Sequence, residues 1–193
     1  MNDLVRELAD AMERHLDQPY SMFGHSLGGL IAFETVRALR RRGAPQPEHL
    51  FVAAMHAPDR GPYRRGIHDL PRNLLVKELS EVWGHRNAAL GDDDVLDLVL
   101  PYLRADCELY EHYSYTAEAP LDCPITAFHG RHDSLIRESD VAAWAVQTVQ
   151  AFHLEVFEGD HFFPDQADFV RPFLSEITAS LGAARVMKQA RGR

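Results

Sequence analysis

The sequence predicts an α/β fold in which a mostly parallel sheet is flanked by helices. Short apolar segments typical of buried strands alternate with amphipathic helical segments, and this alternation favours a parallel sheet covered on both faces. The chain has 193 residues, enough for one domain with a hydrophobic core but too few for two. Hydrophobic residues make up 46% and charged residues 25%, as in ordinary globular proteins. We therefore expect residues 1–193 to form a single domain.

Two helix–strand pairs are expected before residue 57. Apolar residues recur at helical spacing until Pro19, and again from Leu27 until Gly43, where the chain can leave the helix. The three arginines at 40–42 suit the negative end of the second helix's dipole. The expected elements are a helix over 4–16, a strand over 20–24, a helix over 27–42 and a strand over 50–55.

The last third of the chain returns to the same alternation. Two further apolar segments are typical of strands, and each is followed by a helical pattern. The expected elements are strands over 125–129 and 153–157 and helices over 137–149 and 165–181. The tail over about 183–193 is basic and has no periodicity, so we expect it to be disordered.

A long segment from about 58 to 121 interrupts the alternation. It contains two helical patterns, over 70–82 and 95–110, and Pro101 should kink or divide the second. The segment could be an ordinary helical excursion packed on the sheet, or a lid over a binding channel. Long insertions in compact domains are usually functional, which favours the lid.

Composition excludes several classes of protein. A formal net charge of −9 argues against nucleic acid as a partner, because binding to phosphate backbones depends on clustered Lys and Arg. No apolar run is long enough for a membrane helix, and the acidic, amphipathic N-terminus is not that of a signal peptide. The two cysteines, Cys107 and Cys123, cannot form a disulfide framework and are typical of reduced thiols. We expect a cytoplasmic protein.

Residues 24–28 (GHSLG) fit the nucleophile elbow G-x-S-x-G, with Ser26 as the nucleophile. The pattern is short, but here it follows an expected strand and opens an expected helix, as this motif requires. The turn between them is so sharp that we expect Gly24 and Gly28 both to lack side chains for steric reasons. The backbone N–H of Leu27, at the start of the helix, can donate to the oxyanion of a tetrahedral intermediate.

A serine hydroxyl needs a general base, and the base needs a third group that holds its tautomer. In α/β-hydrolases these partners follow in the order Ser, Asp, His. Asp133 comes just after the strand over 125–129, and His161 just after the strand over 153–157. Both therefore fall in loops at the carboxyl edge of the sheet. The sequence predicts an α/β-hydrolase fold with Ser26, Asp133 and His161 as the catalytic residues.

Other residues compete for these roles. Asp160 is the immediate neighbour of His161 and cannot easily reach the same imidazole, so we favour Asp133 as the acid. His129 and His132 could suggest a metal pair, but no third ligand has a persuasive spacing, so we expect no metal and no cofactor. His25, which precedes the nucleophile, is expected to line the substrate entrance rather than to act as the base.

Several segments resemble one family closely: the type II thioesterases of polyketide and nonribosomal peptide synthesis. The similarity runs from about Asp3 to Leu181. The segments that carry it are 19–29 (PYSMFGHSLGG) with 32–34 (AFE) behind them, 100–106 (LPYLRAD), 113–115 (YSY), 120–125 (PLDCPI) and 159–163 (GDHFF).

The resemblance implies hydrolysis of acyl groups from the phosphopantetheine arm of acyl or peptidyl carrier proteins, which clears stalled synthases. It also implies the same three catalytic residues, Ser26, Asp133 and His161. The insertion then becomes a lid over an acyl channel, with Leu74 and Leu103 as candidate substrate contacts. The alternatives are a general carboxylesterase or fatty-acyl thioesterase, since a fold does not determine a substrate, and an inactive remnant that only binds carrier proteins.

The chain departs from the family at its start. The family normally has several strands, and a loop with the second oxyanion donor, before the helix that begins here near Asp3. We therefore expect the N-terminal part of the usual sheet to be missing, and the strand over 20–24 to lack its normal neighbour. Loss of one oxyanion donor costs on the order of 10² to 10³ in rate.

An acidic enzyme that meets acidic carriers would need a local basic patch, because distant charges are screened beyond about 8 to 10 Å. Arginines at the start of the insertion are the candidates, since they follow the strand over 50–55. The expected patch consists of Arg60, Arg64, Arg65 and Arg72.

Overall fold

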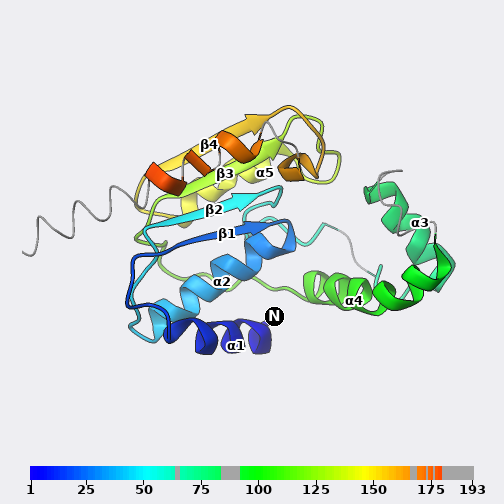
Figure 1. The fold of residues 1–193 in the computed structure, drawn as a ribbon, viewed down its shortest axis with the longest axis horizontal. Helices are drawn as coiled ribbons and strands as arrows, with labels where there is room; N and C mark the ends of the chain where they lie inside the picture. The colour runs from blue at the N-terminus through cyan, green and yellow to red at the C-terminus, as the bar shows by residue number, and fades with distance from the viewer. Residues whose placement is uncertain (64–65, 84–91, 166–168, 173, 176, 180–193) are drawn as a thin grey trace, which may run out of the picture. The chain divides into compact units, whose positions relative to one another are not determined.

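A four-stranded parallel sheet with strand order β1-β2-β3-β4 forms the centre of the fold (Figure 1). The computed structural model describes residues 1–63, 66–83, 92–165, 169–172, 174–175 and 177–179. The strands are β1 (Ser21–His25), β2 (His49–Ala53), β3 (Ile125–Gly130) and β4 (Phe152–Phe157). The helices are α1 (Asn2–Glu13), α2 (Leu27–Arg41), α3 (Arg72–Trp83), α4 (Asp93–Glu111) and α5 (Glu138–Ala142), with short 3-10 helices η3 (Ala143–Gln147) and η4 (Phe163–Asp165). The predicted parallel sheet with flanking helices is confirmed.

The chain divides into two compact units. The first, here called the sheet unit, comprises Asn2–Arg60 and the chain from Thr116 onward; the second, the insertion unit, comprises Gly61–Tyr115 together with Met1. All four strands belong to the sheet unit. In the part of the chain that is described, no helix is long and apolar enough to span a bilayer.

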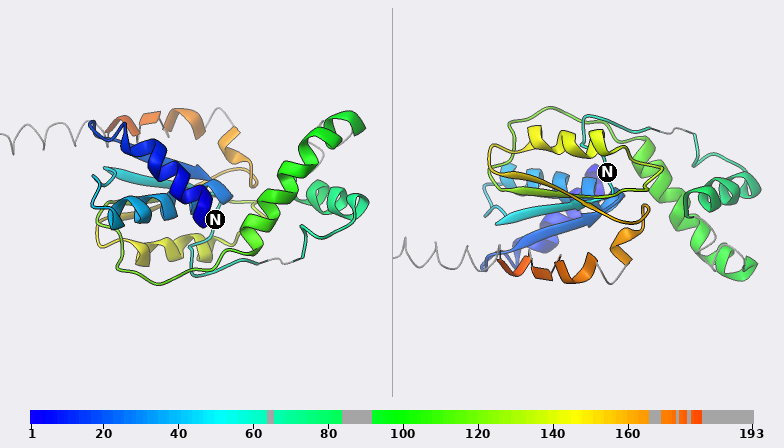
Figure 2. Two further views of the ribbon diagram at one scale, coloured as in Figure 1. Left: turned by 90° about the horizontal axis from the view of Figure 1, so that it is seen from below. Right: turned by 90° about the horizontal axis from the view of Figure 1, so that it is seen from above.

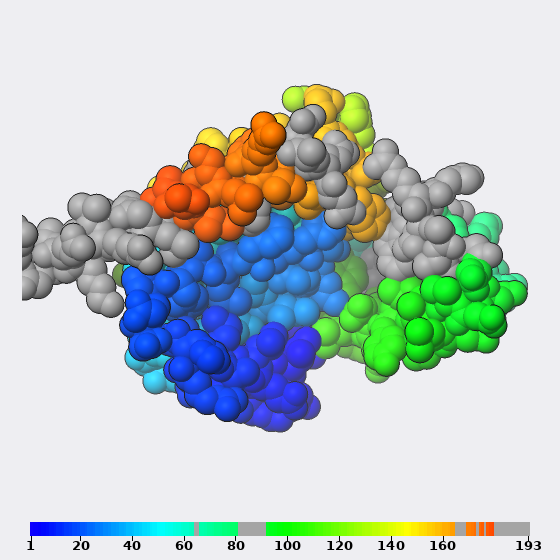
Figure 3. All heavy atoms as spheres, in the orientation of Figure 1, coloured from blue at the N-terminus to red at the C-terminus, as the bar shows by residue number. Residues whose placement is uncertain are grey.

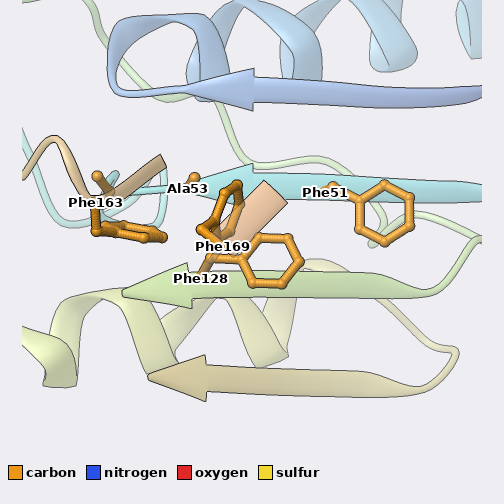
Figure 4. Packing of buried hydrophobic residues seen from close by; sticks show 6 residues of the cluster. Phe51, Ala53, Phe128, Phe163 and Phe169 are labelled. Carbon is orange, nitrogen blue, oxygen red and sulfur yellow. The ribbon is translucent and has the colours of Figure 1, made fainter. Parts of the chain in front are cut away.

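The two central strands, β2 and β3, are almost entirely buried, and their side chains alternate between the two faces of the sheet. One face carries Phe51 and Ala53 of β2 and Phe128 of β3, which pack against Phe163 and Phe169 (Figure 4). The helices α2 and α5 cover the opposite face, whereas the described helical residues between 169 and 179 lie on the phenylalanine side (Figure 2). Right-handed crossovers between successive parallel strands place α2 and α5 on the same face.

The N-terminal helix buries most, but not all, of the apolar residues whose spacing predicted it. Leu16 is buried and Leu8 and Met12 are half-buried, whereas Leu4 is 37% exposed. Within α1 the fully buried residues are Val5 and Ala9. In the space-filling view, the N-terminal residues (blue) and the helical residues after 169 (orange) appear on the same visible side (Figure 3). The expected end of the last helix at residue 181 and the tail over about 183–193 lie outside the described residues.

The helix expected over 137–149 is wrong in its second half. Regular α-helix covers only α5, and the next turn is the 3-10 helix η3. Buried Trp144 donates its indole N–H to the Met55 carbonyl at 2.9 Å. Thr148 is extended and forms an isolated parallel bridge with Leu121, so the chain must leave the helix before that residue.

In the insertion unit, α3 and α4 share a small core in which Leu75, Leu79 and Leu100 are buried. Pro101 lies inside α4 but does not divide it. Proline removes one backbone hydrogen bond from the helix. Leu96 and Leu100, which precede Pro101 in α4, are buried, and this packing stabilises the helix there.

Two side chains of α4 hold the chain that leads into α3. The Glu111 carboxylate accepts hydrogen bonds from the backbone N–H groups of residues 66–68 and from the His68 ring. Arg104 donates to the carbonyls of His68 and Leu70. Burial alone would raise the pKa of Glu111, but the hydrogen bonds from the His68 ring and from the three backbone N–H groups lower it. The insertion unit is therefore fastened by polar contacts to the backbone as well as by its apolar core.

In the sheet unit, Glu118 fastens the segment that leads toward β3 onto α2. Its carboxylate pairs with Arg37 at 2.9 Å, Arg40 at 3.0 Å and Arg41 at 2.7 Å. Arg37 is only 2% exposed and also donates to the Thr116 carbonyl. The arginines at the end of α2 thus bind specific acceptors, beyond their effect on the helix dipole. Burial alone would raise the pKa of Glu118, but the hydrogen bond from Arg40 and the other two arginines lower it.

Glu118→Gln should lower the free energy of unfolding by about 1–2 kcal/mol at pH 7, because buried Arg37 loses a charged acceptor. A carboxyl whose pKa is lower in the folded state stabilises the fold above its unfolded pKa, and this contribution disappears as the pH falls through the folded value. The difference between wild type and variant should therefore shrink on acidification. Urea unfolding at several pH values measures it. Glu48→Gln, at an exposed position, is the control; an equal loss in both variants would contradict the role of Glu118.

Candidate active site

Three loops at the carboxyl edge of the sheet bring polar side chains together. Because the strands are parallel, their carboxyl ends meet at one edge. Ser26 directly follows β1, while Asp133 and His161 lie in the loops after β3 and β4. The last two loops are tied by backbone hydrogen bonds from Arg131 N–H to the Phe157 carbonyl at 2.8 Å and from His132 N–H to the Gly159 carbonyl at 2.9 Å.

The backbone of Ser26 is in a strained conformation, with φ 53° and ψ −131°. A non-glycine residue in such a region costs of order 1–3 kcal/mol and persists only where its surroundings hold it. Here the Ser26 N–H donates to the Ala53 carbonyl, and the Ser26 carbonyl accepts from Gly29 N–H, both at 2.8 Å. Ser26 is the only residue between β1 and α2, as a nucleophile elbow requires.

Only one of the two elbow glycines that we singled out is required for steric reasons. A Cβ on Gly24 would lie 2.1 Å from the Gly28 carbonyl oxygen and 2.5 Å from the Gly29 nitrogen, which is impossible. A Cβ on Gly28 would meet nothing within 4 Å. The expectation that Gly28 must lack a side chain is therefore wrong: the crowding falls where the strand ends, and Gly28 already points into open space.

The side chains of Ser26, His161 and Asp133 form a continuous hydrogen-bonded chain. His161 Nε2 lies 3.0 Å from Ser26 Oγ, and His161 Nδ1 lies 2.9 Å from Asp133 Oδ2. A carboxylate can only accept, so the ring proton of neutral His161 belongs on Nδ1. Nε2 is then unprotonated and can accept the Ser26 proton. The arrangement can generate a serine nucleophile.

Asp133 is held as an ionised carboxylate. Its side chain is fully buried, and its Oδ1 accepts the N–H groups of Leu135 at 2.8 Å and Ile136 at 3.1 Å. Burial alone would raise the pKa of Asp133, but the hydrogen bond and charge of His161, with the two backbone amides, lower it. Asp133 therefore stays negatively charged at neutral pH.

Two of the rival residues, Asp160 and His132, have other partners. Asp160 accepts the Phe162 N–H at 2.9 Å and thereby shapes the turn around His161. His132 pairs with Glu158 at 3.2 Å on the surface, whereas His129 is buried in β3. Within the described ranges, no three His, Cys, Asp or Glu side chains are grouped so as to hold a metal ion.

The other residues singled out from the sequence fall in different places. Leu27 is the first residue of α2, so its N–H has no acceptor within the helix and is free to face an oxyanion. His25 lies beside His161, with ring centroids 5.3 Å apart. In the insertion unit, Leu74 is 44% exposed, whereas Leu103 packs against the core of that unit.

The expected basic patch is only partly described. Arg60 lies 3.4 Å from Asp59, and Arg72 pairs with Asp93 and Asp97 at 3.0 Å. Arg64 and Arg65 lie outside the described residues.

Two residues at the site escaped the sequence analysis. A Cβ on Gly130 would lie 2.4 Å from the Asp160 carbonyl oxygen, so this glycine lets the two loops approach. Glu158 pairs with both Arg131 and His132 across the same loops. A glycine at the end of a buried strand, three residues before the candidate acid Asp133, is a signal that could have identified Gly130.

The sheet, the strained elbow at the end of β1 and the Ser–His–Asp chain place the protein in the α/β-hydrolase class. The structure is similar to RedJ, a thioesterase from the prodiginine biosynthetic pathway in Streptomyces coelicolor, with a TM-score of 0.85 and 36% identity over 93% of this chain and 71% of RedJ. It is also similar to YbtT, a type II thioesterase from the yersiniabactin NRPS/PKS pathway, with a TM-score of 0.80 and 30% identity over 94% of this chain and 74% of YbtT.

The model of the thioesterase domain family matches residues 1–181, and the chain belongs to this family. The gramicidin S biosynthesis protein GrsT of Aneurinibacillus migulanus is 34% identical over 163 residues, which cover 84% of this chain. The chain spans 64% of the length of GrsT.

The two elbow glycines provide a matched pair for a test. Gly24→Ala should prevent the elbow from closing, because the added methyl would overlap backbone atoms that cannot move aside. Thermal unfolding should show a large loss of stability, and a fluorophosphonate should no longer label Ser26. Gly28→Ala should keep the stability or raise it by up to about 1 kcal/mol, because alanine is the better helix former. Equal damage in both variants would contradict this assignment.

Proposed function

We propose that the protein is a serine thioesterase that hydrolyses acyl groups from the phosphopantetheine arm of carrier proteins in polyketide or nonribosomal peptide synthesis. The observation that carries the proposal is the hydrogen-bonded order Ser26 Oγ, His161 and Asp133 in a chain of the thioesterase domain family. Ser26 is the nucleophile, His161 the general base and Asp133 the group that holds its tautomer.

Acylation is the first half of the proposed reaction. Ser26 Oγ attacks the thioester carbonyl carbon while its proton moves to His161 Nε2, 3.0 Å away. The Leu27 N–H, at the positive end of α2, donates to the resulting oxyanion. As the tetrahedral intermediate collapses, the C–S bond breaks and His161 protonates the departing pantetheine thiol. The acyl group is left as an ester of Ser26.

Deacylation repeats the sequence with water. His161 takes a proton from the attacking water, and a second tetrahedral intermediate forms at the same carbonyl carbon. Its collapse breaks the bond to Ser26 Oγ, which regains the proton from His161, and releases a carboxylic acid. Asp133 stabilises the imidazolium that forms in both halves and is not itself protonated.

The relatives support the carrier-protein substrate over a simple ester. YbtT is by its title a type II thioesterase from an NRPS/PKS biosynthetic pathway, RedJ is a thioesterase from the prodiginine biosynthetic pathway, and GrsT is a gramicidin S biosynthesis protein. We place the reaction in the cytosol, in keeping with the free cysteines Cys107 and Cys123. We further propose that the insertion unit, which leaves the sheet after β2, acts as the lid that selects the acyl chain.

Ser26→Ala and His161→Ala should each abolish turnover of acyl-loaded carrier proteins, because members of such a triad act as a unit. Asp133→Asn should lower kcat by roughly 10⁴ with little change in KM, because an amide favours the wrong imidazole tautomer. Steady-state release of free acid from several acyl carriers measures both effects. Asp160→Asn is the matched control and should retain most of the activity.

Three outcomes would contradict the proposal in different ways. If a fluorophosphonate still labels the Ser26→Ala variant, another residue is the nucleophile. Faster hydrolysis of simple soluble esters than of acyl carriers would favour a general carboxylesterase. Carrier binding without turnover would identify a remnant that only binds its partner.

Leu74 and Leu103 should respond differently to substitution. Leu74→Asp, at an exposed position, should change the preference among acyl chain lengths while leaving the melting temperature nearly unchanged. Leu103→Asp should lower the melting temperature and reduce activity on all chain lengths alike, because it places a charge against the core of the insertion unit. Kinetics on a series of acyl chain lengths, with thermal unfolding, measures both. An unaltered chain-length preference in Leu74→Asp would remove this leucine from the substrate site.

A further inference from the structure

A hydrogen bond links the residue before the nucleophile to the backbone of the general base. His25 is the last residue of β1 and is joined to Ser26 by a peptide bond. Its Nε2 lies 2.9 Å from the carbonyl oxygen of His161. The two histidines are 136 residues apart in sequence, so this contact joins the elbow to the loop after β4.

The direction of this hydrogen bond is determined by its acceptor. A carbonyl oxygen can only accept, so His25 Nε2 must carry a hydrogen, in either the neutral or the charged form of the ring. The ring is half-buried and lies 5.3 Å from the His161 ring and 6.0 Å from the Phe162 ring, measured between centroids. The His25 side chain therefore lies beside the base, with its Nε2 at the His161 carbonyl.

We propose that His25 is a positioning residue that sets the distance between Ser26 and His161; this inference rests on the proposed function. His161 is held at its Nδ1 by Asp133 and at its own carbonyl by His25, while its Nε2 faces Ser26 Oγ. Because His25 and Ser26 are consecutive residues, the same stretch of backbone positions both the nucleophile and the side chain that contacts the base. A misplacement of about 1 Å in such a pair can cost on the order of 10² in rate.

The loop around His161 has other anchors, which separates positioning from folding. Phe163 is fully buried in the core, and its N–H donates to the Asp160 carbonyl at 3.1 Å. Asp160 in turn caps the Phe162 N–H, and its carbonyl packs against Gly130. The turn should therefore persist without His25, while the His161 peptide loses the contact that orients it.

The test compares variants that remove the donor with one that keeps it. In His25→Gln the side-chain amide can reach the place of Nε2 and donate; in His25→Leu no donor remains, and in His25→Asn the amide is too short to reach. Two readouts are measured: the rate constant for fluorophosphonate labelling of Ser26, and kcat and KM for an acyl carrier protein. His153→Leu, the same change at an exposed position of β4, is the matched control.

We expect His25→Leu and His25→Asn to lower the labelling rate constant and kcat about 10- to 100-fold, with KM changed by less than about threefold. His25→Gln should restore most of both rates, and His153→Leu should match wild type. If His25→Leu does not fold, the comparison of His25→Asn with His25→Gln decides alone.

Equal losses in the Gln and Asn variants would overturn the proposal, as would a change confined to KM or to chain-length preference. The second result would make His25 a wall of the substrate entrance. The labelling rate needs no carrier protein. If the fluorophosphonate labels Ser26 of the wild-type chain but the chain does not hydrolyse acyl carriers, the proposed function is refuted. The labelling rates of the His25 variants still test the role of His25 in that case.

Discussion

The parallel alignment of four strands is the constraint on which the rest of the site depends. It brings the ends of β1, β3 and β4 to one edge, so that side chains more than a hundred residues apart can share hydrogen bonds. The loops after β3 and β4 are then tied to each other by backbone bonds and by the close approach at Gly130. Because the two loops are already held together, the His161 and Asp133 side chains start close to each other, and this limits the conformational entropy lost when they pair.

In the elbow, the strained backbone conformation falls on Ser26, the residue whose hydroxyl must be accessible to the substrate. Ser26 adopts a positive φ, and both its backbone N–H and its carbonyl are paired, so the surrounding backbone holds the conformation. Gly24 makes this possible, because any side chain there would overlap the first turn of α2. The same turn leaves the Leu27 N–H at the start of the helix, where a developing negative charge is favoured.

Charged side chains hold the chain near both ends of the insertion, through backbone groups at one end and mainly through ion pairs at the other. Within the insertion unit, Glu111 and Arg104 bind amides and carbonyls of the segment before α3. Within the sheet unit, Glu118 gathers three arginines of α2, one of which also holds the Thr116 carbonyl. Buried charges of this kind are costly unless paired, and here each has several partners.

Local patterning determined the class of fold and the candidates for the site. Periodicity separated strands from helices, and the position of Ser26, Asp133 and His161 just after strands was enough to propose them together. Other features depended on distances between segments far apart in sequence, which no local pattern contains. Tertiary structure alone decided that Asp160 caps the Phe162 N–H, that Gly24 and not Gly28 is crowded, and that His25 holds the His161 carbonyl. It also ended α5 early, because Thr148 had to extend to bridge Leu121.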